Sequence, residues 1–174
     1  MRGGYTLIEL VIVVVIIGIL AVSVIPAFGT VDAARRTAAA DEITRLLVLT
    51  RAEATATGDA AGVAVSAGES SIVPLRVNEA GTSTEPIPGP TGEGRPALLI
   101  GAAFPGVLIT SVTLGDGSAA DGTIWFGHDG TPRLRDVNLV DVGPATTDSV
   151  IEVTGGERVR VRRLSGAIER EAAP

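Results

Sequence analysis

The feature that most constrains this chain is an uninterrupted apolar run near its N-terminus. From Leu10 to Phe28, nineteen residues (LVIVVVIIGILAVSVIPAF) pass without one charged side chain. As a helix rising about 1.5 Å per residue, the run is about 28 Å long, close to a bilayer core of about 30 Å. A helix of a soluble domain would normally carry a polar face, and this run has none. The sequence therefore predicts a membrane-spanning helix.

Two ordinary membrane segments account for part of this pattern. A secretory signal has a candidate cleavage site in the small residues Ala21-Val22-Ser23, but the region ahead of the run is only MRGG. The run is also longer than the usual apolar part of a signal, about 7–15 residues. A plain single-pass anchor leaves unexplained the carboxylate of Glu9 at the start of the run and the polar-faced helix that follows.

The first 28 residues, MRGGYTLIELVIVVVIIGILAVSVIPAF, resemble the class III signal of type IV pilins and type II secretion pseudopilins. In that family a short leader ends in Gly, a prepilin peptidase cleaves after it, the new N-terminus is methylated, and a Glu lies at the fifth mature position. The resemblance implies that Gly4 ends the leader, that Tyr5 is methylated and that Glu9 is the fifth mature residue. Gly18 and Pro26 fall where pilins often carry helix-weakening residues. The chain departs from the family in having Tyr instead of the usual Phe and a leader with one Arg.

Glu9 needs a partner if it lies at bilayer depth. An ionised carboxylate there costs about 2.5–3.5 kcal/mol on insertion scales. The α-amine of Tyr5, which keeps its charge when methylated, is such a partner on the same or a neighbouring helix. In the alternative, Glu9 lies at the cytoplasmic headgroups and reaches water with no partner.

A second helical pattern follows the apolar run. Apolar and small side chains recur at spacings of three and four, which predicts one face that packs on a core. The charged residues between them predict a solvated face, and Gly58 is a natural stop. The stripe consists of Ile43, Leu46, Leu47, Thr50 and Ala54; the charged face carries Arg35, Arg36, Asp41, Glu42, Arg45, Arg51 and Glu53.

After Gly58 the pattern changes to short apolar runs separated by turn residues. Residues 78–96, with PIPGPTGEGRP, predict a mobile loop, and His128-Asp129-Gly130 predicts a hairpin turn. A long helix followed by short strands predicts an α+β, pilin-like fold with an antiparallel sheet packed on the helix. We expect strands at 62–66, 71–77, 97–100, 107–114, 123–126, 133–139, 149–154 and 158–164. The predicted organisation is a leader (1–4), a transmembrane and assembly helix (5–28), an amphipathic helix (29–58) and a periplasmic β-rich domain (59–174).

Three segments resemble H-type minor pseudopilins, the GspH/FimT group. They are DEITRLLVLTRAEATATGDAAGVAVS, where a helix ends in Gly directly before a Val-rich strand, and IWFGHDGTPR and VRVRRLSGAIER near the C-terminus. Major pseudopilins carry a calcium-linked C-terminal loop, and no such pattern is present in the sequence. The resemblance implies a subunit that assembles with other pseudopilins.

The composition argues against catalysis and cofactors. The chain has no Cys and a single His, His128, which excludes thiolate chemistry and leaves little imidazole for metal sites or triads. No P-loop, dinucleotide fingerprint or nucleophile motif is present. Asp116, Asp121 and Asp129 have oxygens that calcium could use, but their Asp-Gly settings are those of ordinary turns. We therefore expect no enzyme, no metal and no cofactor.

A row of arginines near the C-terminus is a candidate DNA-binding surface. Arg158, Arg160 and Arg162 alternate with valines, which places three guanidinium groups on one strand face. Some competence pili bind DNA through a basic C-terminal region, but a net charge of −6 argues against a dedicated nucleic-acid binder. The alternative is an edge strand whose arginines face water or carboxylates.

Three functions remain open on the sequence. The first is a minor pseudopilin of a type II secretion system, processed by prepilin peptidase and held in the inner membrane by one span. The second is a minor pilin of a competence pilus that presents the basic strand to DNA. The third is a membrane-anchored periplasmic domain that does not assemble. Basic residues flank the span on both sides, with Arg2 before it and Arg35 and Arg36 after it. The distribution of positive charge therefore does not predict the orientation of the span.

Overall fold

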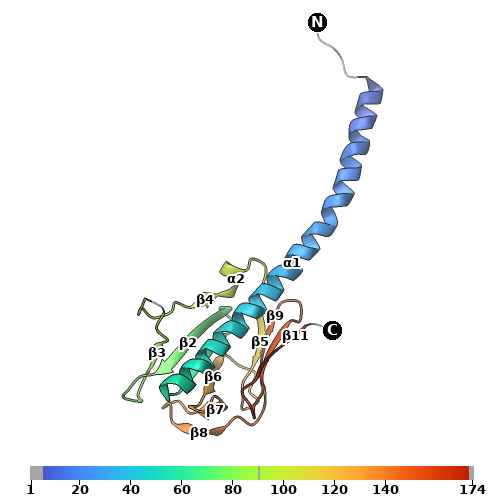
Figure 1. Cartoon of the computed structure of the whole chain (residues 1–174). Helices are drawn as coiled ribbons and strands as arrows, with labels where there is room; N and C mark the ends of the chain where they lie inside the picture. Colours follow the sequence, from blue (N-terminus) through green and yellow to red (C-terminus); the bar gives the residue numbers. More distant parts are fainter. Residues whose placement is uncertain (1–5, 90, 173–174) are drawn as a thin grey trace. The chain divides into compact units, whose positions relative to one another are not determined.

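A computed structural model describes residues 6–89 and 91–172, without the side chains of residues 21–28. The chain divides into two compact units, Met1–Ala34 and Arg35–Pro174. Helix α1 (Leu7–Thr57) contributes to both units, so that the two predicted helices are one element (Figure 1). It ends at Gly58, whose backbone has a φ of +80° and whose N–H donates to the carbonyl of Ala54 at 3.1 Å. Gly58 therefore ends the helix as predicted.

The first sheet of the second unit has seven strands, all paired antiparallel. Its order is β3-β2-β1-β6-β7-β8, and the short β4 also pairs with β2. The turn between β6 and β7 contains Gly130, as predicted for His128-Asp129-Gly130. The strands are β1 (Ala61–Ser66), β2 (Ser71–Val77), β3 (Thr84–Pro86), β4 (Leu98–Leu99), β6 (Gly122–Phe126), β7 (Pro132–Arg135) and β8 (Asp141–Pro144).

The second sheet has four strands in the order β11-β10-β9-β5, also antiparallel. A four-residue helix, α2 (Ile100–Ala103), follows β4 directly. The strands of this sheet are β5 (Ile109–Thr113), β9 (Ser149–Val153), β10 (Arg158–Val161) and β11 (Ile168–Glu171).

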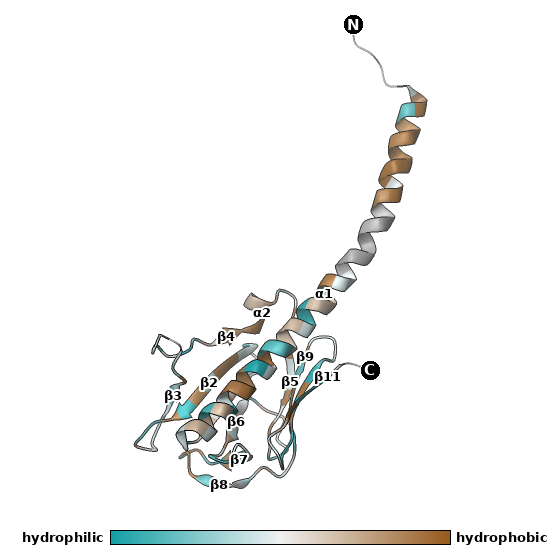
Figure 2. Ribbon diagram, in the orientation of Figure 1, coloured by the Kyte–Doolittle hydropathy of each residue, from teal (hydrophilic) through white to brown (hydrophobic). Residues whose placement is uncertain are grey.

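One hydrophobic core joins the helix to both sheets. The predicted helical stripe is confirmed, because all five of its residues are buried, with Ile43, Leu47 and Ala54 fully inaccessible. The hydroxyl of Thr50 donates to the carbonyl of Leu46 at 2.8 Å, which satisfies its polar atom inside the core. Figure 2 shows polar and apolar residues alternating along this part of α1. The sheets contribute Val63, Val65, Ile72, Phe126, Ile151, Val153, Val159 and Val161, among others.

Several elements differ from the predicted ones. The predicted loop 78–96 contains β3, which pairs with β2, and Ile87, which is buried in the core. The predicted strand 133–139 is β7 and the turn that follows it. Strand β8, which pairs with β7, is not among the predicted strands; its sequence DVGP contains Gly and Pro, which a strand at the sheet edge tolerates. Strand β10 was expected at an edge, but it lies between β9 and β11. Strand β11, IERE, has the polar composition of an exposed edge and was not predicted.

Candidate assembly and interaction surfaces

The first turn of α1 is closed by a reciprocal pair of hydrogen bonds between Thr6 and Glu9. The backbone N–H and the hydroxyl of Thr6 both donate to Glu9 Oε2 at 2.9 Å, and the N–H of Glu9 donates to Thr6 Oγ1 at 3.4 Å. This is a capping box, T-x-x-E, a pattern that is present in the sequence but that our sequence analysis missed. The carboxylate of Glu9 therefore has partners within its own chain. Gly4 and Tyr5 lie outside the described residues.

The helix after Glu9 presents an uncovered apolar surface. The large apolar side chains from Leu7 to Leu20 are between 49% and 84% exposed, a contiguous patch of the kind that marks contact with a membrane or a protein. Gly18 lies within this segment, and a Cβ there would have no atom within 4 Å. The side chain of Pro26 lies outside the described set. Where the structure describes the chain, no helix reaches the length and hydropathy of a membrane span.

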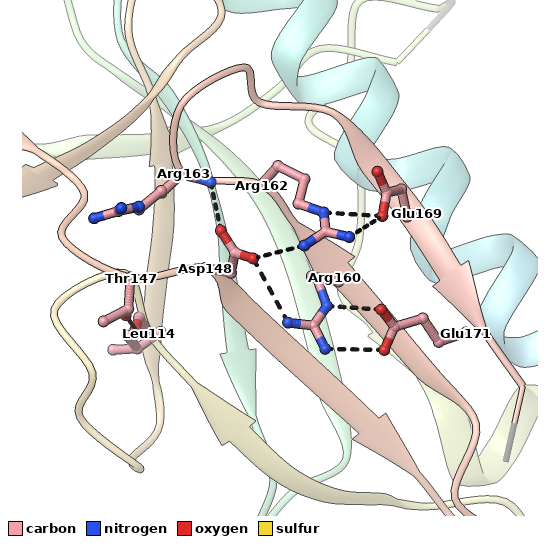
Figure 3. Close-up of polar contacts among 8 residues, drawn as sticks. All are labelled: Leu114, Thr147, Asp148, Arg160, Arg162, Arg163, Glu169 and Glu171. Atoms are coloured by element: carbon pink, nitrogen blue, oxygen red, sulfur yellow. Dashed lines mark hydrogen bonds and ion pairs between the residues drawn. The ribbon is translucent and has the colours of Figure 1, made fainter. Parts of the chain in front are cut away.

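The predicted arginine row lies on the second sheet and is matched by carboxylates (Figure 3). Arg160 donates through Nε and Nη2 to both oxygens of Glu171, at 2.8 and 3.0 Å. Arg162 donates to Glu169 Oε2 at 2.9 Å, and through Nη1 to Asp148 at 3.2 Å. These acids come from β11 and from the residue before β9.

The same arrangement changes the acidity of the carboxyl groups. The backbone N–H of Arg163, which donates to Asp148 at 2.9 Å, and the guanidinium of Arg162 lower the pKa of Asp148. The bidentate guanidinium of Arg160 lowers the pKa of Glu171. Arg158 contacts Glu152 of β9 at 3.5 Å. Each predicted arginine thus faces a carboxylate on a neighbouring strand or loop.

The melting temperature of the chain in detergent is expected to stay level from about pH 7 to about pH 5 and to fall below about pH 4.5. Because the pKa values of Asp148 and Glu171 are lowered on folding, their contribution is present above their unfolded pKa values and is lost as the pH falls through the folded ones. Arg160→Gln should make the fall shallower, since it removes the largest cause of the lowered pKa of Glu171. Melts by circular dichroism at a series of pH values check this; an equally steep fall in the variant would contradict it.

Arg51 of α1 connects two turns that are far apart in the sequence. Its Nε donates to the carbonyl of Gly130, between β6 and β7, and its Nη2 donates to the carbonyl of Ser165, between β10 and β11, both at 2.9 Å. The second turn approaches the first so closely that a Cβ on Gly166 would overlap the carbonyl of Gly130. The expectation that Arg51 belongs to a solvated face is therefore wrong. A second helix residue, Asp41, accepts from Arg170 of β11 at 2.7 Å.

The three turn aspartates hold the loops in which they lie. Asp116 accepts from the N–H of Ser118, and Asp129 accepts from the N–H and hydroxyl of Thr131. Asp121 accepts from the hydroxyl of Ser66 and the N–H of the next residue, both at 2.7 Å. Among residues 6–89 and 91–172, no group of three or more acidic or histidine side chains is placed to hold a metal. Asp116 and Asp129 therefore have the turn role that their Asp-Gly settings indicate, whereas Asp121 joins its loop to the end of β1.

Comparison with known proteins bears on both halves of the chain. A family model of the prokaryotic N-terminal methylation motif matches residues 1–25. A crystal structure of the minor pseudopilin EpsH from the type II secretion system of Vibrio cholerae matches with a TM-score of 0.59 at 13% identity, over 81% of this chain and 96% of that chain. A second structure of EpsH matches with the same TM-score at 12% identity, over 79% and 96%. No curated protein matches in sequence.

These matches confirm two predictions. The α+β, pilin-like fold, with the N-terminal helix packed on antiparallel sheets, is that of EpsH. The resemblance of the N-terminal segment to type IV pilins and pseudopilins, and of the fold to H-type minor pseudopilins, is confirmed by the motif and the structural match together.

Proposed function

We propose that this chain is a minor pseudopilin, a structural and non-enzymatic subunit of the pseudopilus of a type II secretion system. The observation that carries the proposal is the N-terminal methylation motif directly ahead of a domain with the fold of EpsH. The large apolar side chains from Leu7 to Leu20, which are 49% to 84% exposed, are what a subunit would bury against neighbouring helices or lipid. Its partners would be other pseudopilins and the prepilin peptidase that processes it.

The anchoring of the subunit is part of the same proposal. Residues 1–4 would be the leader and residues 5–28 the span through the inner membrane, with the C-terminal domain in the periplasm. The nineteen uncharged residues from Leu10 to Phe28 support this, because their length as a helix fits a bilayer core. Gly18 and Pro26 would then lie within the span, where neighbouring helices pack.

Intact-mass spectrometry of the chain extracted from membranes is expected to give a mature protein without Met1–Gly4 and with one added methyl group. The reason is the Gly4–Tyr5 junction ahead of Glu9, within the matched methylation motif. Replacement of Gly4 by a bulky residue should leave the leader in place and serves as the control. A mature chain that begins after Ser23 would instead identify a secretory signal. An uncleaved chain would favour the membrane-anchored domain that does not assemble.

The competence-pilus alternative depends on the arginine row. Arg158, Arg160 and Arg162 alternate along the chain as a DNA-binding face would require. Each of them, however, is already engaged by a carboxylate, which leaves little net positive charge to displace counterions from a phosphate backbone. We therefore favour the subunit of a secretion pseudopilus over the DNA-binding pilin of a competence pilus.

The full chain in detergent is expected not to bind duplex DNA at physiological salt, because its basic strand is neutralised by its own acids. Electrophoretic mobility shift over a range of salt concentrations checks this. Binding that weakens steeply with salt, and that disappears when Arg158, Arg160 and Arg162 are all changed to Gln, would favour the competence pilus. Arg133→Gln, on the first sheet, is the matched control for a loss of cationic charge elsewhere.

A further inference from the structure

A second exposed apolar surface, apart from the apolar residues Leu7 to Leu20 of α1, surrounds α2. The segment from Pro96 to Leu108, PALLIGAAFPGVL, contains no charged residue. Ile100 and Val107 are buried in the core and fix the segment to the domain, while Leu99 and Leu108 are 50% and 53% exposed. We call five of its exposed residues the apolar rim; they are Leu99, Ala102, Ala103, Pro105 and Leu108.

The apolar rim lies at the end of the domain where α1 enters it. The N–H of Leu108 donates to Thr154 Oγ1 at 3.0 Å, and the N–H of Thr154 donates back to the carbonyl of Leu108 at 2.9 Å. The next residue, Gly155, lies against the side chain of Arg36, so closely that a Cβ there would overlap it. Leu108 and Arg36 therefore belong to the same end of the domain.

The connection between the domain and the proposed span is short. Eight residue steps lead from Phe28, the end of the apolar run, to Arg36. As a helix they extend about 12 Å, and fully extended they reach at most about 28 Å. In either conformation Arg36 would lie within about 28 Å of the end of the proposed span, so that this end of the domain could reach the bilayer surface.

We propose that the apolar rim rests on the phospholipid surface of the membrane that anchors the chain, with Leu99 and Leu108 inserted at the headgroups. This inference depends on the proposed function, since it requires residues 5–28 to span that membrane. Interfacial binding combines a buried apolar area with basic side chains that attract anionic lipid, and Arg36 supplies the basic group. Two half-exposed leucines are too little for independent binding, but the short tether raises their effective concentration at the surface.

Lipid fits the apolar rim better than a neighbouring protein does. The rim consists of small and aliphatic side chains without aromatic anchors, whereas the centres of protein interfaces are enriched in Tyr, Trp and Arg. It also lies at the end of the domain that the tether holds near the bilayer, and every subunit has that surface available before it meets another. The rim would therefore act in the stored, unassembled subunit.

The test uses the full chain, which has no cysteine of its own. Single variants Leu99→Cys and Leu108→Cys are labelled with an environment-sensitive dye and reconstituted at low density into vesicles of phosphatidylethanolamine and phosphatidylglycerol. The matched control is Val137→Cys, a 97% exposed position on the β7–β8 hairpin. That hairpin lies beside Gly58, at the opposite end of the helix within the domain.

A quencher attached near the lipid headgroups should reduce the emission at Leu99 and Leu108 by about half and leave Val137 unchanged. Arg36→Gln, or vesicles without the anionic lipid, should weaken the quenching. If the chain floats with the vesicles but the rim positions are not quenched, the inference is wrong and the proposed function stands. A chain that does not float with vesicles at all overturns both. A response that appears only at high protein density would identify a protein partner, and it too overturns the inference.

Discussion

Replacing Glu9 with Val is expected to block incorporation of the chain into complexes with neighbouring pseudopilins while leaving the melting temperature of the domain unchanged. Glu9 contacts Thr6 and no residue of the hydrophobic core, so its removal takes no core contact away. In a packed filament, loss of the carboxylate would leave the α-amine of Tyr5 without its counter-charge. Breaking a buried pair costs about 3–5 kcal/mol, which corresponds to more than a hundredfold loss of incorporation.

The capping box supplies the control for this experiment. Glu9→Gln keeps a side chain that can accept from the N–H of Thr6, so it preserves the helix start while removing the charge. We expect the Gln variant to fail in crosslinking and co-purification as the Val variant does. If Gln assembles and Val does not, Glu9 acts through the cap and not through its charge. Normal incorporation of both variants would mean that Glu9 has no part in assembly.

Gly166→Ala is expected to destabilise the globular domain by more than about 3 kcal/mol. Gly166 has a φ of +63°, a conformation that costs a residue with a Cβ about 1–2 kcal/mol. In addition, the new methyl group would overlap the carbonyl of Gly130, which accepts from Arg51. The two turns would have to separate, and the hydrogen bonds from Arg51 would be lost or lengthened. Chemical denaturation of the full chain in detergent measures the effect.

The Gly92→Ala variant serves as the control, because it measures the loss of stability that comes from backbone strain without the steric overlap. Gly92 also has a positive φ, +83°, but a Cβ there would meet no atom within 4 Å. This variant should therefore lose only about 1–2 kcal/mol. If Gly166→Ala lowered the free energy of unfolding no more than Gly92→Ala does, the close approach of the two turns would not contribute to stability.

The parts of the fold that follow from local pattern were predictable. The spacing of Ile43, Leu47 and Ala54 predicts the buried face of α1 because helical geometry alone brings those positions together. Strands β1, β2 and β9 were predicted for the same reason, since their apolar runs are bounded by turn residues. The T-x-x-E pattern of the capping box is equally local, because Thr6 and Glu9 are three residues apart at the start of the helix.

Other features depend on contacts between distant residues and have no local signal. Arg51 pairs with carbonyls 79 and 114 residues away, and its sequence neighbourhood resembles any exposed helix face. The carboxylates that face Arg160 and Arg162 come from Asp148 and from an edge strand that is polar enough to pass for a loop. The burial of Ile87 likewise follows from the pairing of β3 with β2. The many Gly and Pro residues around Ile87 predict a loop there, so the sequence gives no sign of this pairing.

The contacts between α1 and the last strands also fix when the domain can fold. Arg51 and Asp41 bind residues of the β10–β11 hairpin, and Asp41 and Arg170 are 129 residues apart in the chain. Val159 and Val161 of β10 complete the core around the helical stripe. During synthesis, the helical stripe therefore lacks part of its cover until β10 and β11 have followed it, more than 100 residues later in the chain. Folding dominated by such distant pairings is slow. In the proposed export to the periplasm, Ile43 and Leu47 would be exposed for that interval, and the bilayer surface or a chaperone would have to shield them.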